Sequence, residues 1–232
     1  MIVMLKNNVW KIIALSVLLT CLSSCDEIFE LEQTKAPSAV SIDRDELVLM
    51  VGDTCRLAAE LTGSYTSPLI YWTSIDEDKA RVLSDGSVVA LSPGDARIVV
   101  MSVSDTEVRD TAVAHIMDIP TVKETDFRYD MPVYAAVDGV NIEKNSSRRI
   151  MAYCGSELRG VSRLLMVTDG NGKNHYCFLI RTVSNTQAGD VLSFRYYDSN
   201  LGSIIDLKET ISFSHDSFAG YPSSPFLFTV MP

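Results

Sequence analysis

Basic residues are scarce in this sequence of 232 residues. Lys and Arg number 20 against 30 Asp and Glu, which gives a formal net charge of −10 at pH 7, and no long basic run occurs. A nucleic-acid-binding surface depends on Lys and Arg side chains that neutralise phosphates. The composition therefore excludes nucleic acid as a partner.

Residues that perform catalysis or hold cofactors are also few. The sequence has 3 histidines and contains no C-x-x-C pair, G-x-S-x-G, H-E-x-x-H or Walker loop. Ser214, His215 and Asp216 stand in a row, but neighbours on a strand point to opposite faces, so they cannot form a nucleophilic relay among themselves. We therefore expect no enzymatic activity, no cofactor and no metal site.

Long apolar runs are absent except near the N-terminus. Lys6 and Lys11 precede the run IIALSVLLTCL, which has the length of a signal-peptide core. A membrane-spanning helix needs roughly 20 apolar residues, so this run is too short. Residues 22–25, LSSC, resemble a bacterial lipobox, in which the cysteine thiol receives diacylglycerol and cleavage follows. We predict a signal peptide over residues 1–24 and lipidation of Cys25, by palmitate or similar acyl chains that anchor the chain in the membrane.

Acidic residues follow the cysteine at once, at Asp26, Glu27, Glu30 and Glu32. This cluster is similar to the export signal of Bacteroidota-type surface lipoproteins. The resemblance implies that the chain is displayed on the outer membrane, with residues 25–35 as an acidic tether. A tether on the periplasmic side is the alternative, and the sequence leaves it open.

Cysteines are few in the rest of the chain. Beyond the lipidated position, Cys55, Cys154 and Cys177 remain, an odd number for an oxidising compartment. A hairpin expected around residues 167–180 places Cys177 opposite a residue near Leu165 and away from Cys154. We therefore expect three buried, unpaired cysteines, with pairing of Cys154 and Cys177 as the open alternative.

Short strands separated by turns fill residues 36–118. Asp85-Gly86 and Pro93-Gly94 mark tight turns, and no amphipathic helical pattern interrupts the series. The pattern predicts an antiparallel β-sandwich. The candidate strands alternate β-branched or apolar residues with polar ones, and they are VSI, ELVLMV, CRLAAEL, LIYWTS, ARVL, SVVAL, ARIVVMSV and TAVAHI.

This segment resembles a group 2 bacterial Ig-like domain. It contains, in order, V-x-I, L-x-x-x-V-G-D-T, W-x-S-x-D, V-x-x-x-G-x-V-x-A and P-G-x-A-x-I, within AVSIDRDELVLMVGDTCRLAAEL and YWTSIDEDKARVLSDGSVVALSPGDARIVVMS. The family occurs in surface adhesins and as a spacer in extracellular proteins, so the resemblance implies interaction or spacing and no catalysis. Trp72 belongs to this pattern and is expected in the sandwich core, with a role as an exposed binding platform as the alternative.

A second all-β module is expected over residues 119–232, after Pro120 and the polar TVKETD. Its candidate strands are FRYDMPVYAAVDG, RRIMAYCG, LRGVSRLLMV, HYCFLIRTV, DVLSFRYYDS and TISFSH. The run VTDGNGKNHYCFLI is the strongest hairpin signal in the chain. The module resembles a C-terminal module of secreted and surface proteins of the same bacterial group, which implies a second β-sandwich and an extracellular setting but no agreed ligand. The segments that carry this resemblance are YDMPVYAAVDG, AYCGSELRGVSRL, YCFLIRTVSNTQAGDVLSFRYYDS and SFAGYPSSPFLFTV.

The strand DVLSFRYYDS offers candidate binding residues. Phe194 and Tyr196 share one face of the strand and Arg195 and Tyr197 the other, and one pair is expected in the core. We predict that Arg195, Tyr197 and Asp198 contribute to a sugar or peptide site. The alternative is an ordinary solvated strand face.

Asp110-Thr111-Ala112 matches the short acceptor pattern for O-glycosylation in these bacteria. The pattern predicts a glycan on Thr111, which would add hydration to an exported protein.

Together these features predict two tandem β-sandwiches after a lipoprotein signal peptide. The chain would be a cell-surface binding or adhesion protein whose Ig-like spacer presents the C-terminal module to a glycan or to a host or surface protein. The alternative is a structural accessory subunit of an outer-membrane complex, with no soluble ligand.

Overall fold

The computed structural model describes residues 35–144, 146–168 and 172–231. Within these ranges the chain is built from strands, with one short 3-10 segment, η1 (Glu124–Asp126). None of the described helical segments has the length and apolar character needed to cross a membrane. The all-β prediction is confirmed, whereas the predicted signal peptide and Cys25 lie outside the described residues.

The first domain holds the strands between Ala39 and Met117, arranged in three sheets. These are a four-stranded sheet in the order β2-β9-β8-β5, a three-stranded sheet β3-β7-β6 and the pair β1-β4. The strands are β1 (Ala39–Ile42), β2 (Glu46–Met50), β3 (Thr54–Arg56), β4 (Ala59–Thr62), β5 (Ile70–Ser74), β6 (Ala80–Val82), β7 (Ser87–Ala90), β8 (Gly94–Ser102) and β9 (Arg109–Met117).

One apolar core fills the space between these sheets. Leu49, Val88, Ile98 and Ala114 are each fully buried within it, and Trp72 is 6% exposed. Alternate residues of each strand face inward because side chains alternate across a strand. Trp72 is thus a core residue, as the sequence predicted.

Two details of this domain differ from expectation. The run CRLAAEL forms two strands, because the chain crosses between sheets at Leu57 and Ala58. The Leu57 N–H bonds the carbonyl of Gly86, and the Ala58 N–H bonds the Asp43 carboxylate at 3.0 Å. The sandwich is also not antiparallel throughout, since β2 pairs with β9 in parallel. A parallel pair needs a long connection, and here the intervening strands supply it.

The second module is one eight-stranded sheet that curls into a sandwich or half-barrel. Its path is β15-β14-β11-β12-β13-β10-β17, and β16 pairs with β14. The strands are β10 (Tyr129–Val137), β11 (Arg149–Cys154), β12 (Glu157–Thr168), β13 (Asn174–Ser184), β14 (Ala188–Asp198), β15 (Ser203–Asp206), β16 (Ile211–Ser214) and β17 (Phe226–Phe228). The sequence prediction missed β15 and β17, each of which is four residues long or shorter.

Long shared strands make this sheet curl. β12 pairs with β11 through Glu157–Val161 and with β13 through Ser162–Thr168. Gly160 stands at the change of partner, where an added Cβ would lie 2.8 Å from Ile180 Cγ2 and 2.9 Å from the Arg181 carbonyl oxygen. Glycine is required there because β12 comes too close to β13 for a side chain.

Phe178, Phe194, Tyr196 and Phe228 fill the core enclosed by the curled sheet. Of the two faces of the β14 strand, the one that carries Phe194 and Tyr196 therefore packs inside the module. Ring contacts such as that of Phe194 with Phe228, 4.6 Å between centroids, add to the packing.

The cysteine predictions are largely confirmed. Cys55, Cys154 and Cys177 are all unpaired, and Cys177 stands opposite Leu165 in the β12–β13 hairpin. Cys55 and Cys177 are buried. Cys154 is half-buried, which corrects the expectation of full burial, because it ends β11 at the edge of the core.

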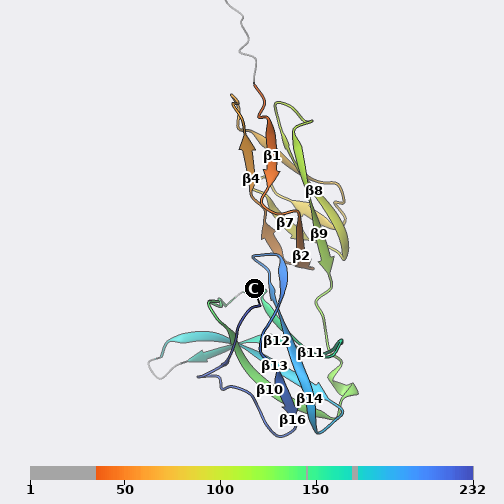
Figure 1. The fold of residues 1–232 in the computed structure, drawn as a ribbon, viewed down its shortest axis with the longest axis vertical. Helices are drawn as coiled ribbons and strands as arrows, with labels where there is room; N and C mark the ends of the chain where they lie inside the picture. Colours follow the sequence, from red (N-terminus) through yellow and green to blue (C-terminus); the bar gives the residue numbers. More distant parts are fainter. Residues whose placement is uncertain (1–34, 145, 169–171, 232) are drawn as a thin grey trace, which may run out of the picture.

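The two units lie end to end (Figure 1). The chain enters the Ig-like domain through β1, which pairs with β4 at the end far from the second module, while β2 and the loop before β15 meet at the junction. Met50, Met151 and Tyr197 form a small buried cluster across this junction. The two units are therefore in direct contact at this junction.

Candidate functional site

The structure places the three residues predicted to bind a ligand in different settings. Arg195 has 54% of its side chain exposed and pairs with Asp206 at 3.0 Å. Tyr197 is fully buried and Asp198 is 4% exposed. Only Arg195 lies on a solvated strand face, and ligand binding by these three residues stays a prediction.

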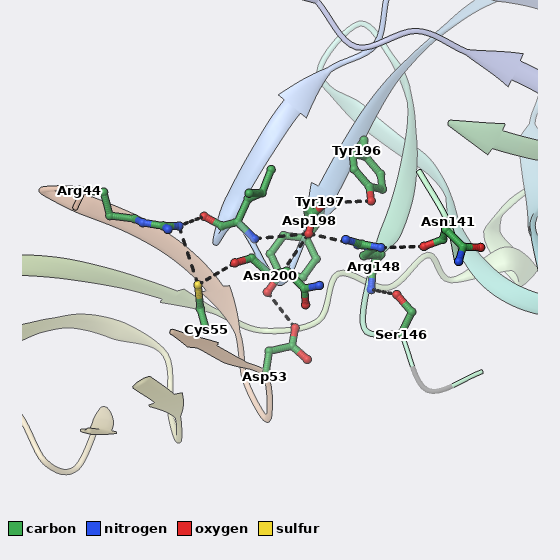
Figure 2. A network of polar contacts seen from close by, with 11 residues as sticks. Arg44, Asp53, Cys55, Asn141, Ser146, Arg148, Tyr196, Tyr197, Asp198 and Asn200 are labelled. Carbon is green, nitrogen blue, oxygen red and sulfur yellow. Dashed lines mark hydrogen bonds and ion pairs between the residues drawn. The ribbon is translucent and has the colours of Figure 1, made fainter. Parts of the chain in front are cut away.

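Tyr197 lies between the two units (Figure 2). Its hydroxyl donates to the Asp53 carboxylate at 2.8 Å and accepts from the Met50 N–H at 3.1 Å. Burial raises the pKa of Tyr197 well above its ordinary value, so the hydroxyl keeps its proton and stays a donor. A side chain of β14 thereby completes the hydrogen bonding at the end of β2.

The loop after β14 adds backbone contacts to the same face of the Ig-like domain. Arg44 donates to the Leu201 carbonyl at 2.6 Å, and the Cys55 thiol donates to the Asn200 carbonyl at 3.1 Å. The Val48 N–H bonds the carbonyl of Gly202. Tyr197, Asn200, Leu201 and Gly202 thus all bond the Ig-like domain.

Asp198 orders this loop through the hydrogen bonds of its carboxylate (Figure 2). It accepts from Arg148 Nε at 3.1 Å, from the Tyr196 hydroxyl at 3.1 Å and from the Asn200 N–H at 2.9 Å. Arg148 also donates to the Asn141 carbonyl at 2.9 Å. A buried ion pair of this kind adds little net stability but imposes one geometry on the groups around it.

A polar cleft of about 460 Å³ opens beside this network, lined by residues of both units. Its charged groups include Asp53 and Arg148, which are already bonded within the junction. Asp53 bonds Tyr197 across the junction, and Arg148 bonds Asp198 within the second module, so both side chains already have structural partners. We interpret the cleft as the rim of a structural joint.

A second, more apolar surface lies on the outer face of the curled sheet, and we call it the β10 groove. It consists of two adjoining hollows of about 340 and 250 Å³, which share Pro132 and Tyr134 as a common wall. The first hollow is lined by Glu124, Asp130, Pro132, Tyr134, Val161, Arg163, Leu179 and Arg181, and the second by Pro132, Tyr134, Phe218, Tyr221 and Pro222.

Strand register explains the first hollow. Outward-facing residues of β10 stand opposite outward-facing residues of β13, with Pro132 paired to Arg181 and Tyr134 to Leu179. Arg163 of β12 stands opposite Leu179 in turn. Because residues directly opposite on antiparallel strands share a face, these side chains form one surface.

The chain ending SFAGYPSSPFLF builds the second hollow. Ala219 exchanges backbone hydrogen bonds with β10, its N–H to Pro132 and its carbonyl from the Tyr134 N–H. Gly220 follows with φ +68°, and an added Cβ would lie 2.3 Å from the Tyr134 carbonyl oxygen. Only glycine fits this close approach, which sets the flanking Phe218 and Tyr221 beside β10.

Two aromatic side chains at the start of this segment face solvent. Phe218 is 50% exposed and Tyr221 is 58% exposed, and their rings meet edge to face with centroids 4.9 Å apart. Adjacent exposed aromatic and apolar side chains mark binding surfaces more often than isolated apolar residues do.

The histidines lie apart from these surfaces. His115 pairs with Asp95 at 2.8 Å on the outer face of the Ig-like domain, and His215 lies against Tyr129 with ring centroids 4.8 Å apart. His175 lies on β13. Among the described residues no group of three His, Cys, Asp or Glu side chains is placed to hold a metal ion.

Thr111, the predicted glycan acceptor, is exposed on β9. Its N–H bonds the Asp110 carboxylate at 2.8 Å. The hydroxyl is on the solvated side of the strand, and its modification stays a prediction.

Sequence reasoning missed the β10 groove. The ending SFAGYPSSPFLFTV indicates a family resemblance but does not by itself predict a surface. The alternation in YDMPVY, which puts Asp130, Pro132 and Tyr134 on one face, was a usable signal. The contact between Tyr134 and the segment at Tyr221 could not be predicted from the sequence, because it joins residues far apart in the chain.

The comparisons identify the first unit. Residues 37–112 match the bacterial Ig-like domain (group 2) family. The molecule is therefore a β-protein with an Ig-like domain followed by a second sandwich or half-barrel. No curated protein matches the chain.

Two solved structures match the chain at low sequence identity and low TM-score. Domains 4-9 of the surface layer protein SbsC are 10% identical, with 80% of this chain and 32% of that chain covered and a TM-score of 0.32. The Bacteroides ovatus mixed-linkage glucan utilization locus SGBP-B, in complex with mixed-linkage heptasaccharide, is 11% identical, with 75% and 47% covered and a TM-score of 0.23. The chain spans less than half the length of each.

Proposed function

We propose that this protein is a lipid-anchored cell-surface binding protein. In this proposal residues 1–24 are removed, Cys25 carries the lipid, residues 25–35 are a tether, residues 36–118 are a spacer and residues 119–232 are the binding module. The match of residues 37–112 to an Ig-like family supports a spacer or adhesion role and gives no support to catalysis.

The junction is the observation that carries the proposal. Tyr197, Asp53 and Met50 form buried hydrogen bonds between the units, and the loop at Asn200 and Leu201 adds others. A flexible linker would let the module move freely. A fixed joint holds its outer face in one orientation, which lowers the entropy cost of binding.

The geometry also fits attachment at one end and binding at the other. β1 lies at the end of the Ig-like domain remote from the second module (Figure 1). A membrane anchor upstream of β1 would hold the β10 groove at the distal end of the molecule. Arg195, also exposed on the distal module, is a further proposed contact, and Thr111 a proposed glycosylation site on the spacer.

Metabolic labelling with a palmitate analogue tests the anchor. We expect label on the wild-type chain, none on Cys25→Ser and full label on Cys21→Ser, the matched control within the same segment. Label that survives Cys25→Ser would contradict the lipid anchor.

External protease on intact cells tests surface display, with a periplasmic protein as the control for cell integrity. We expect the protease to digest the second module on intact cells. Full protection would place the chain on the periplasmic side. Recovery of one stoichiometric membrane partner by cross-linking, with no binding to external ligands, would favour an accessory subunit instead.

A further inference from the structure

We propose that the β10 groove binds a chain of neutral sugar residues, with a sugar ring against Tyr134 and Tyr221 and its hydroxyls on the charged side chains around Arg181. This inference rests on the proposed binding function and specifies both its site and its ligand class. It differs from the sequence prediction, which placed a sugar or peptide site around Arg195.

The groove has two chemically different halves that meet at one wall. One half presents the aromatic and proline side chains of Phe218, Tyr221 and Pro222, and the other presents charged side chains. Pro132 and Tyr134 border both. A pyranose ring has the same division, because its faces carry C–H groups and its rim carries hydroxyls. Small-molecule sites commonly combine an apolar lining with a few placed polar groups.

The charged half is balanced in sign. Arg181 bonds the Asp130 carboxylate at 3.1 Å and the Glu124 carboxylate, and Arg163 lies on the same face. Two cationic and two anionic side chains thus line this hollow. Such a set offers donors and acceptors but no net charge, which suits hydroxyl groups that both donate and accept.

The charge of the whole chain argues against anionic ligands. The formal net charge is −10, and removal of Lys6 and Lys11 with a signal peptide would make it more negative. A polyanion such as a sulfated or uronic acid polymer would be repelled over several ångströms. A neutral polymer is not affected.

The topology argues against an extended peptide that adds a strand. β10 is hydrogen-bonded on one side to β13 and on the other to β17 and Ala219, and β12 and β13 pair with each other. The groove is therefore a sheet face, and β10 at its centre is paired on both sides, so a peptide backbone cannot add a strand beside it. Ligands must bind through side chains, as a sugar chain does.

Affinity electrophoresis of the chain from Asp26 onward tests the inference. The gels contain neutral glucans, mannans, galactans or xylans, and separate gels contain polygalacturonate or heparin. We expect at least one neutral polymer to retard the wild-type chain and the anionic polymers to have no effect. Circular dichroism and thermal melting confirm that each variant is folded.

Matched variants locate the site. Tyr221→Ala removes a ring that is 58% exposed, and Tyr71→Ala removes one that is 57% exposed on the Ig-like domain. We expect Tyr221→Ala to lower the affinity about tenfold or more, since truncating a central aromatic contact has that effect. Tyr71→Ala should leave the affinity unchanged.

Arg181→Ala and Arg195→Ala form a second matched pair. Both arginine side chains are 54% exposed and both are paired with an aspartate, at 3.1 and 3.0 Å. Loss of affinity in Arg181→Ala alone supports the β10 groove. Loss in Arg195→Ala alone would overturn this site and favour the one predicted from the sequence.

The outcomes separate the ligand class from the broader function. Binding to a protein array that is lost in Tyr221→Ala, without retardation by neutral polymers, would overturn the sugar ligand and keep the binding function. Retardation only by anionic polymers, or equal retardation of Tyr221→Ala and the wild-type chain, would overturn the inference. Silence with both polymers and proteins would count against the inference and the binding function together.

Discussion

Replacement of Tyr197 by phenylalanine should uncouple the two units. The ring is fully buried, so its apolar packing stays, and only the hydroxyl is lost. That hydroxyl donates to Asp53, which is 6% exposed, and accepts from the N–H of Met50, which is fully buried. In the variant the Asp53 carboxylate and the Met50 N–H remain buried, and each loses its hydrogen bond to the tyrosine hydroxyl.

The expected cost follows from those two partners. A hydrogen bond to a charged group contributes about 1.5–3 kcal/mol, and a buried N–H left without a partner costs about 1–3 kcal/mol. The two effects share one group and are not additive. We therefore expect Tyr197→Phe to lower the free energy of unfolding by about 2–4 kcal/mol.

Urea denaturation measures this effect with two probes. Trp72, buried in the Ig-like core, reports the first domain, and far-ultraviolet circular dichroism reports both units. Tyr153→Phe is the control, because its hydroxyl meets only the weak acceptor Met151 Sδ at 3.6 Å. The two transitions should coincide in the wild-type chain and separate in Tyr197→Phe. Equal stability of the two variants would refute the junction as the element that couples the units.

Three further predictions concern the same molecule. Burial raises the pKa of the Cys55 thiol, so at neutral pH iodoacetamide should modify half-buried Cys154 before Cys55. The substitution Tyr197→Phe should speed the reaction at Cys55. Mass spectrometry of peptides gives both modification rates, and equal rates for the two cysteines in the wild-type chain would contradict the closed junction. Gly202→Ala should destabilise the chain more than Gly139→Ala in thermal melting. Both glycines have positive φ, but only an added Cβ at Gly202 meets the Ig-like domain, 3.0 Å from Leu47 Cβ. Equal losses of stability would show that backbone strain alone accounts for the effect. Hydrogen bonds from Ser184 and the nearby Arg159 lower the pKa of Asp190 below 3.8. Its contribution to the free energy of unfolding is therefore present above pH 3.8 and is lost as the pH falls through the lowered pKa. Urea titrations at several pH values should show a smaller loss of stability in acid for Asp190→Asn than for the wild-type chain, and parallel curves would contradict this.

The strand pattern of the chain was predictable because it depends on local alternation. The eight candidate segments of the Ig-like domain and six of the second module fall on observed strands, and Trp72 lies in the core. The hairpin register that places Cys177 opposite Leu165 also followed from the turn between them. Local sequence determines these features, since period-two burial and turn residues act over a few positions.

The relation between the units was not predictable from local pattern. Tyr197 faces outward from its own sheet, as alternation requires, yet it is buried because the Ig-like domain covers it. The CRLAAEL segment divides because its N–H groups at Leu57 and Ala58 donate to the Gly86 carbonyl and the Asp43 carboxylate, which directs its halves to different sheets. Both features depend on contacts between distant parts of the chain.

The candidate site shows the same limit. The sequence pointed to Arg195, Tyr197 and Asp198, and the structure uses the last two at the junction and within its supporting loop. The groove instead joins β10 to the segment around Gly220, which is about eighty-five residues later in the chain, by a single β-bridge and its neighbours. Short β-bridges leave almost no periodic signal in a sequence.

Binding of fluorescent neutral polysaccharides to intact cells tests the account most directly. Cells would display the wild-type chain, the Phe218→Ala/Tyr221→Ala variant or Tyr71→Ala, with surface amounts equalised by an antibody against the Ig-like domain. The account predicts that cells with the wild-type chain and with Tyr71→Ala bind a neutral polymer and that cells with the double variant do not. Equal binding by all three, or failure of the antibody to reach the chain on intact cells, would contradict it.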